Sequence, residues 1–143
     1  MTFPVADIQP LSFHLGMIYA FIEVVASGCK HLALSPPMTA QELDQVRQAA
    51  LDTAAEYGVA TLVNAECLVT RLFNPEFIEG KHVILFAAER ATLDEYLALK
   101  DLRGRCLADG NLLEREEEIA RRFGRLLSYS EDSIEGLLER PRF

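Results

Sequence analysis

The first strongly hydrophobic segment of the chain, residues 13–27, predicts a helix without a polar face. Ser12 stands where an N-cap belongs, and Gly28 stands where a left-handed C-terminal stop belongs. Apolar residues occupy every side of this segment in a helical projection, so the helix must be covered all round. We therefore expect it to lie between the sheet and other helices, or to be covered on one side by a second copy of the chain.

Three short apolar segments predict β-strands, at residues 30–34, 59–63 and 82–87. The last of these is a continuous apolar run after His82, which is the pattern expected when both faces of a sheet are covered.

Capping boxes mark the start of two further helices. Thr39 is followed three residues later by Glu42, and Thr92 is followed in the same way by Glu95. Apolar residues at helical spacing follow both boxes, and two amphipathic segments complete the chain. In addition to the first helix, helices are predicted at residues 40–57, 93–107, 112–127 and 131–139.

Residues 64–73 fit two structures. Leu68 and Leu72 would face inward on a short helix, whereas Val69 and Thr70 have the propensity for a strand. The segment is followed by loop signals at Asn74-Pro75 and Glu79-Gly80.

The order of the elements predicts an α/β fold. Alternating strands and helices indicate a small, mostly parallel sheet of three or four strands with flanking helices. The strand–helix–strand unit of residues 30–63 should be a right-handed crossover between parallel strands. We expect a single α/β domain over residues 1–143, in which residues 112–143 form a helical C-terminal extension or layer.

Composition and charge exclude several classes of protein. The chain has 143 residues, half of them apolar and a quarter charged, which is a globular composition and not a disordered one. The net charge of −8 and the intermixing of acids with the C-terminal arginines speak against nucleic acid and anionic membranes as partners. Glu117–Arg121 and Glu118–Arg122 are i,i+4 pairs of a solvated helix face.

The cysteines and the apolar runs of the sequence indicate the cellular compartment in which the protein is expected. Cys29, Cys67 and Cys106 are widely spaced and odd in number, so a reduced, cytoplasmic setting is favoured over a disulfide framework. The first ten residues hold no basic residue, so they do not resemble a signal peptide. The apolar run of residues 13–26 is shorter than the roughly 20 residues that span a bilayer.

The motifs of known cofactor and metal sites are missing from the sequence. It contains no glycine-rich nucleotide loop, no HExxH or CxxC pair, and no GxSxG elbow. We therefore expect neither a cofactor nor a metal site, and the sequence leaves open whether the protein is an enzyme.

A candidate site follows from the predicted parallel sheet. Ligands of open α/β sheets bind at the carboxyl ends of the strands, where helix N-termini favour anions. Polar residues that follow the second and third predicted strands should therefore converge on a small anionic ligand. The residues expected to bind it are Asn64, Glu66, Cys67, Arg71, Glu89 and Arg90.

Two members of this set have alternative interpretations. Arg71, in a strongly apolar setting, either binds an anion, or extends into solvent, or pairs with Glu66 or Glu89. Cys67 could be a nucleophile if its thiolate were stabilised, but most cysteines in apolar segments are small buried side chains.

Two hypotheses about function result. The first is a small soluble cytoplasmic α/β protein that binds a small anionic ligand, as a homodimer. The alternative is a non-catalytic oligomerisation or protein-interaction module, suggested by the apolar first helix and the amphipathic C-terminal helices.

Overall fold

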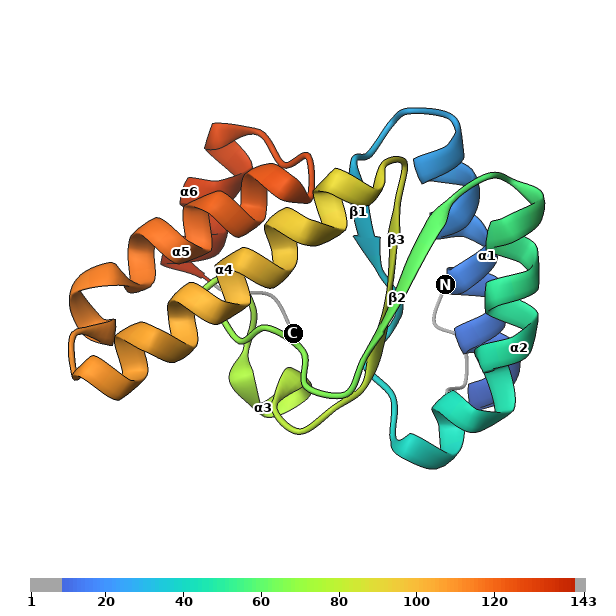
Figure 1. Cartoon of the computed structure of the whole chain (residues 1–143), viewed down its shortest axis with the longest axis horizontal. Helices are drawn as coiled ribbons and strands as arrows, with labels where there is room; N and C mark the ends of the chain where they lie inside the picture. Colours follow the sequence, from blue (N-terminus) through green and yellow to red (C-terminus); the bar gives the residue numbers. More distant parts are fainter. Residues whose placement is uncertain (1–8, 141–143) are drawn as a thin grey trace.

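A computed structural model describes residues 9–140 of the chain (Figure 1). Residues 1–8, which we expect not to form a signal peptide, and residues 141–143, the end of the predicted C-terminal extension, lie outside the described part. The elements, in order, are α1 (Pro10–Ala26), β1 (Leu32–Leu34), α2 (Ala40–Glu56), β2 (Ala60–Asn64), α3 (Pro75–Ile78), β3 (Val83–Ala87), α4 (Arg90–Asp109), α5 (Leu112–Leu126) and α6 (Glu131–Glu139).

The sheet is antiparallel, so the predicted mostly parallel sheet is wrong. The strand order is β1-β3-β2, and β3 runs antiparallel to both of its neighbours. Leu32 pairs with Ala87 at one end of the sheet, and Asn64 pairs with Val83 at the other. β1 and β2 therefore do run in the same direction, but the last strand in sequence lies between them and is reversed.

The reversal follows from the connection that precedes β3. After β2 the chain does not cross the sheet on a long helix; it passes through an irregular segment and the four-residue helix α3. A strand that follows without a crossover enters the sheet at the same end at which the previous strand finished. It therefore runs antiparallel to that strand.

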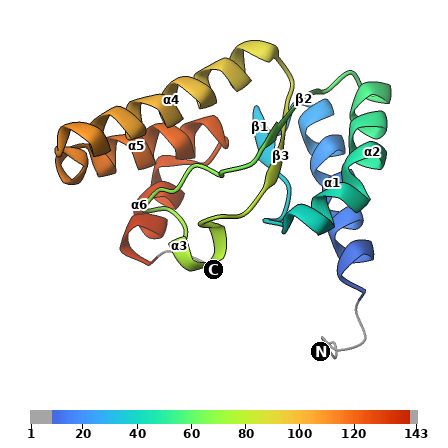
Figure 2. The ribbon, with the colours of Figure 1, turned by 60° about the horizontal axis from the view of Figure 1, so that its bottom comes forward.

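Both faces of the sheet are covered, as the apolar run of β3 predicts. All five residues of β3 are buried. Ile84 and Phe86 belong to one core, with α1 and α2. The alternate residues Val83, Leu85 and Ala87 belong to a second core, with α4, α5 and α6. Figure 1 and Figure 2 show these two groups of helices on opposite sides of the sheet. Burial on both faces made the strand look like part of a parallel sheet.

Helix α1 is covered on one side only. Ile18, Ile22 and Val25 pack into the core, and the outward side includes Phe13 and Tyr19, which are 50% and 44% exposed. The helix begins at Pro10 after Gln9, earlier than predicted, because proline is well suited to the first turn.

Local capping explains where two other helices begin. The predicted capping box at α2 is confirmed: the Glu42 N–H donates to Thr39 Oγ1, and the Thr39 N–H donates to Glu42 Oε1 at 2.9 Å. The box predicted at Thr92 is wrong, because α4 already begins at Arg90 and Glu89 is its N-cap residue.

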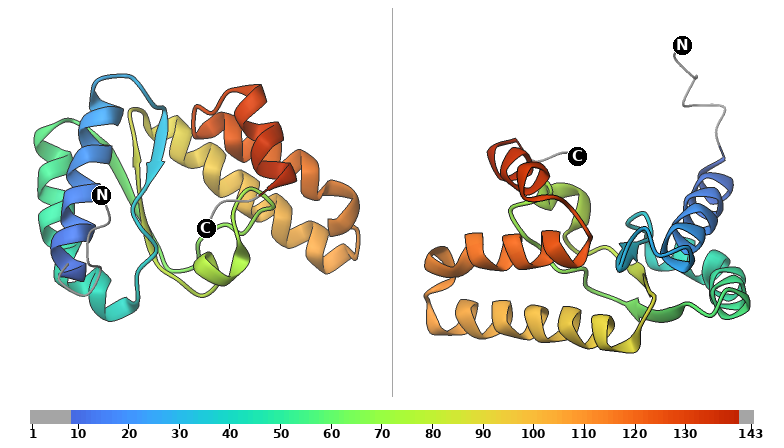
Figure 3. Two further views of the ribbon diagram at one scale, coloured as in Figure 1. Left: turned by 180° about the vertical axis from the view of Figure 1, so that it is seen from behind. Right: turned by 90° about the horizontal axis from the view of Figure 1, so that it is seen from above.

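Helices α4 and α5 form an antiparallel pair that projects away from the sheet, as Figure 3 shows from above. α6 folds back onto α5, where the Arg125 guanidinium contacts Glu131 at 2.8 Å. The predicted Glu117–Arg121 pair is confirmed at 2.9 Å, but Glu118 pairs with Arg115 rather than with Arg122. Residues 65–74 are neither helix nor strand, and they run beneath the helix pair.

Candidate functional site

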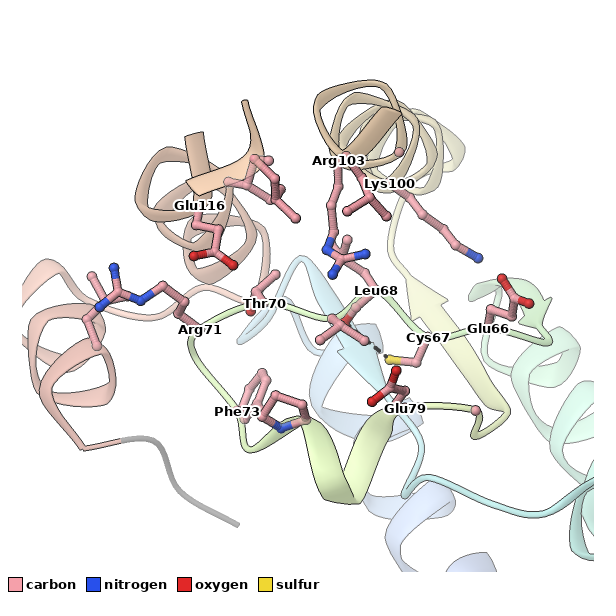
Figure 4. Close-up of a pocket in the computed structure, with 18 residues that line it drawn as sticks. Glu66, Cys67, Leu68, Thr70, Arg71, Phe73, Glu79, Lys100, Arg103 and Glu116 are labelled. Carbon is pink, nitrogen blue, oxygen red and sulfur yellow. Dashed lines mark hydrogen bonds between the residues drawn. The ribbon is translucent and has the colours of Figure 1, made fainter. Parts of the chain in front are cut away.

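The candidate site is an open groove between the α4–α5 pair and the irregular segment after β2 (Figure 4). Its volume is about 910 Å³, within the range of small-molecule sites. The segment forms its floor, α4 and α5 form its roof, and Leu138 of α6 lies at one end. α4 and α5 diverge from the sheet here, and a groove remains beneath them. On the other face of the sheet, α1 and α2 are closely packed.

Specific hydrogen bonds fix the floor of the groove. The Leu68 N–H donates to the buried Tyr96 hydroxyl at 2.9 Å, and the Leu72 N–H donates to Thr70 Oγ1 at 3.2 Å. The Cys67 N–H donates to the carbonyl of Lys81 at 3.3 Å. These backbone donors are satisfied outside any strand or helix, which is why the segment remains irregular and yet is held in place.

Three basic side chains line the groove. Figure 4 shows Arg103 directed from α4 toward the floor, Lys100 directed toward the Glu66 end, and Arg71 extending in the opposite direction. Lys100 Nζ donates to Asn64 Oδ1 at 2.9 Å, and the same oxygen accepts the Glu66 N–H. Asn64 is buried, so it holds the rim of the groove instead of presenting its amide to a ligand.

Three carboxylates balance these bases: Glu66, Glu79 and Glu116. Within residues 9–140, no ion pair joins any of the six charged groups to an opposite charge. Arg103 and Glu116 are half-buried, whereas Arg71, Glu66 and Glu79 are exposed. The groove therefore presents both positive and negative charges to a ligand.

Cys67 is a buried thiol, not an activated one. Burial raises the pKa of the Cys67 thiol to about 11, although nearby Lys100 and a hydrogen bond to Tyr96 act in the other direction. A thiol with this pKa is protonated at neutral pH, and the protonated form is a poor nucleophile. The geometry favours the interpretation of Cys67 as a small buried side chain.

The structure brings together only part of the predicted set. Glu66, Cys67 and Arg71 line the groove, and Asn64 supports its rim. Glu89 and Arg90 follow the end of β3 that pairs with Ala60, at the opposite end of the sheet from Asn64. The convergence of all six residues is therefore wrong, because it required β3 to be parallel to β2.

The sequence prediction missed Lys100, Arg103 and Glu116, although a signal for two of them is present. Arg103 lies four residues after buried Leu99, and Glu116 lies three residues before buried Ile119. Each charge therefore interrupts the apolar face of its helix. A charged residue in an apolar stripe at helical spacing is the pattern that identifies them.

No group of three or more His, Cys, Asp or Glu side chains within residues 9–140 is arranged to hold a metal ion. No helix in this part combines the length and apolar character needed to cross a membrane.

Comparison of the chain with protein-family models, with curated proteins and with solved structures finds no match. The groove itself is therefore the basis for inferring a function.

Proposed function

We propose that the protein binds a small molecule with an anionic group in the groove between α4, α5 and residues 65–74. The observation that supports the proposal is Arg103, which is half-buried, points into the groove and has no carboxylate partner among residues 9–140. A guanidinium presents a planar fork of donors that matches a carboxylate or a phosphate group. Lys100, oriented by Asn64, is a second cation near the same floor.

The groove residues support binding more than covalent catalysis. Among residues 9–140, the one thiol that lines the groove is buried and has a raised pKa of about 11, and no histidine of this part of the chain lines the groove. Nucleophilic catalysis needs an activated group within hydrogen-bonding reach of a base. The proposal is accordingly a ligand-binding function in the cytoplasm, where the three unpaired thiols Cys29, Cys67 and Cys106 would stay reduced.

A thermal-shift titration tests this function with hexanoate and inorganic phosphate as probes. A ligand that binds only the native state stabilises it by RT ln(1 + [L]/Kd), so the melting temperature rises with the ligand concentration. We expect at least one probe to stabilise the unaltered protein and Arg103→Gln to abolish the effect. Arg105→Gln is the matched control, because Arg105 is exposed on the same helix and paired with Asp101. Equal shifts in both variants, or no shift with either probe, would contradict the proposal.

A second candidate function is self-association through α1. The exposed aromatic residues Phe13 and Tyr19 on the outward half of this helix favour it, since a second copy could cover them in a symmetric homodimer. Sedimentation velocity at micromolar concentration is the test. A dimer that becomes a monomer in the Tyr19→Glu variant supports this function, and a monomeric unaltered protein removes it.

A further inference from the structure

Two half-buried residues of opposite charge face the groove from adjacent helices. Arg103 lies between Leu99 and Cys106 on the buried face of α4, and Glu116 lies between Leu112 and Ile119 on α5. Residues three or four positions apart share a helix face, so both charges are directed inward and not into open solvent. Figure 4 shows both side chains reaching into the groove.

Several charges that lie outside the groove on the same two helices are paired, whereas these two half-buried charges are not. Arg105 contacts Asp101 at 3.1 Å on α4, and Glu117 contacts Arg121 at 2.9 Å on α5. Within residues 9–140, neither Arg103 nor Glu116 has an ion-pair or hydrogen-bond partner. Charges that are partly removed from water without a counter-charge are unfavourable, and a ligand that supplies both counter-charges relieves this cost.

The balance of charge in the whole groove indicates the same kind of ligand. Among the lining residues that the structure describes, three bases are matched by three acids, so these residues have little net attraction for a multiply charged anion. From this juxtaposition we infer that the ligand is a zwitterion, an amino-carboxylate whose carboxylate binds Arg103 and whose ammonium binds Glu116. The inference depends on the proposed anion-binding function and adds a cationic group to the ligand.

The apolar residues of the groove indicate what the rest of the ligand should be. Leu107, Leu112 and Leu138 line the same groove as the charged pair, and they suit an apolar side chain on the ligand. A free amino acid with an apolar side chain and a short apolar peptide share this chemistry, because both carry an ammonium, a carboxylate and an apolar body.

Isothermal titration calorimetry with four matched probes tests the inference. L-Leucine carries both charges, 4-methylpentanoate lacks the ammonium, 3-methylbutylamine lacks the carboxylate, and leucyl-leucine represents the peptide source. We expect leucine or leucyl-leucine to bind at least about tenfold more tightly than either single-charge probe, because each charge-assisted hydrogen bond adds affinity. Whichever of the two binds more tightly identifies the source.

Two variants assign the ammonium contact. We expect Glu116→Gln to reduce the affinity for the zwitterion to that of 4-methylpentanoate and to leave 4-methylpentanoate binding unchanged. Glu117→Gln is the control, because Glu117 is exposed and one position away on the same helix. Urea midpoints show whether each variant is folded, and the probe series on the unaltered protein tests the inference without any variant.

The outcomes distinguish this inference from the proposed function. Equal affinity for 4-methylpentanoate and the zwitterions overturns the zwitterion and leaves the anion-binding function intact. Tight binding of 3-methylbutylamine alone overturns both. Binding of none of the four probes overturns the zwitterion, and the thermal-shift titration with hexanoate and phosphate then decides the anion-binding function separately. Selective binding of a zwitterion that Glu117→Gln weakens as much as Glu116→Gln does overturns the assignment of the ammonium to Glu116.

Discussion

The two faces of the sheet carry helices in different arrangements. On one face, α1 and α2 lie along the sheet, and Ile18, Ile22, Val46 and Phe86 close the space between them. On the other face, α4 and α5 touch the sheet near one end and then project away from it, over the irregular segment after β2 (Figure 3). The first arrangement fills its interior with side chains, and the second leaves the groove.

This difference separates the closely packed face of the sheet from the face that carries the groove. β3 contributes alternate residues to both cores, so both faces depend on the same five-residue strand. The half-buried, unpaired charges Arg103 and Glu116 lie only on the side where the helices diverge. One face of the sheet is therefore closely packed, and the other face carries the groove that we propose as a ligand site.

The largest expected effect tests whether the two faces fold as one unit. Phe86 is fully buried on the α1–α2 side, and Phe86→Ala should cost about 3–5 kcal/mol of unfolding free energy through lost burial and a cavity. Because β3 serves both cores, urea unfolding should remain a single transition. Amide protection that persists in α4–α6 after α1 and α2 have exchanged would show that the faces are independent.

A pair of glycine variants compares the packing of the two sides. A Cβ at Gly124 of α5 would lie 2.7 Å from Ile134 Cγ1, and Ile134 is itself fully buried. Gly124→Ala should therefore destabilise the protein by about 1–2 kcal/mol, since overpacking outweighs the gain in helix propensity. Gly16→Ala on α1 meets no atom within 4 Å and should stabilise by about 0.5–1 kcal/mol. Urea midpoints that shift in the same direction for both variants would contradict this comparison.

Removing one hydroxyl tests how the floor of the groove is held. The Tyr96 hydroxyl accepts the Leu68 N–H at 2.9 Å in a buried setting. Tyr96→Phe leaves that donor without its partner and should cost about 1–2 kcal/mol. Hydrogen exchange should speed up at the Leu68 amide and not in α1 or α2. Tyr19→Phe on exposed α1 is the control, and an unchanged Leu68 exchange rate would show that the hydrogen bond does not order the segment.

The smallest expected effect depends on pH and concerns the α1–α2 side. The pKa of Glu42 is held below its usual value, first by a hydrogen bond from the Thr39 backbone and then by one from His14, at 2.9 Å. A carboxyl with a lowered folded-state pKa stabilises above its unfolded pKa, about 4.3, and loses that contribution as the pH falls through the folded value.

Gln can still accept the Thr39 N–H, so Glu42→Gln removes the charge and keeps the capping box. It should therefore cost about 0.3–1 kcal/mol at pH 7, and progressively less toward pH 3. Thermal unfolding of both proteins from pH 7 to pH 3 measures the difference. Glu56→Gln, at the exposed end of α2, is the control. A difference that stays constant down to pH 3 would mean that the Glu42 charge has no role.

Local signals were sufficient to predict most of the elements. The Thr39–Glu42 box, the apolar run of β3 and the periodicity of α5 all depend on residues close in sequence, and the structure confirms them. The direction of β3 depends on whether the chain crosses the sheet after β2. Nothing in the irregular residues 65–74 specifies this, because their backbone donors are satisfied by distant partners such as Tyr96.

The candidate site was predicted in part for the same reason. Glu66, Cys67 and Arg71 line the groove because they follow β2 directly, which is a local property. Glu89 and Arg90 were included only through the assumed strand direction. Arg103 and Glu116 are brought to the groove by the pairing of α4 with α5, a tertiary arrangement, although their places on apolar helix faces are visible in the sequence.

The central position of β3 determines when the sheet can form during synthesis of the chain. β1 and β2 have no strand partner until residues 83–87 insert between them. A nascent chain still on the ribosome therefore cannot begin the β-pairing of this sheet before Val83 has emerged from the exit tunnel, and cannot complete it before Ala87 has emerged. Fragments that stop short of β3 should be targets for chaperones and proteases, since the apolar strands they contain have nothing to pair with.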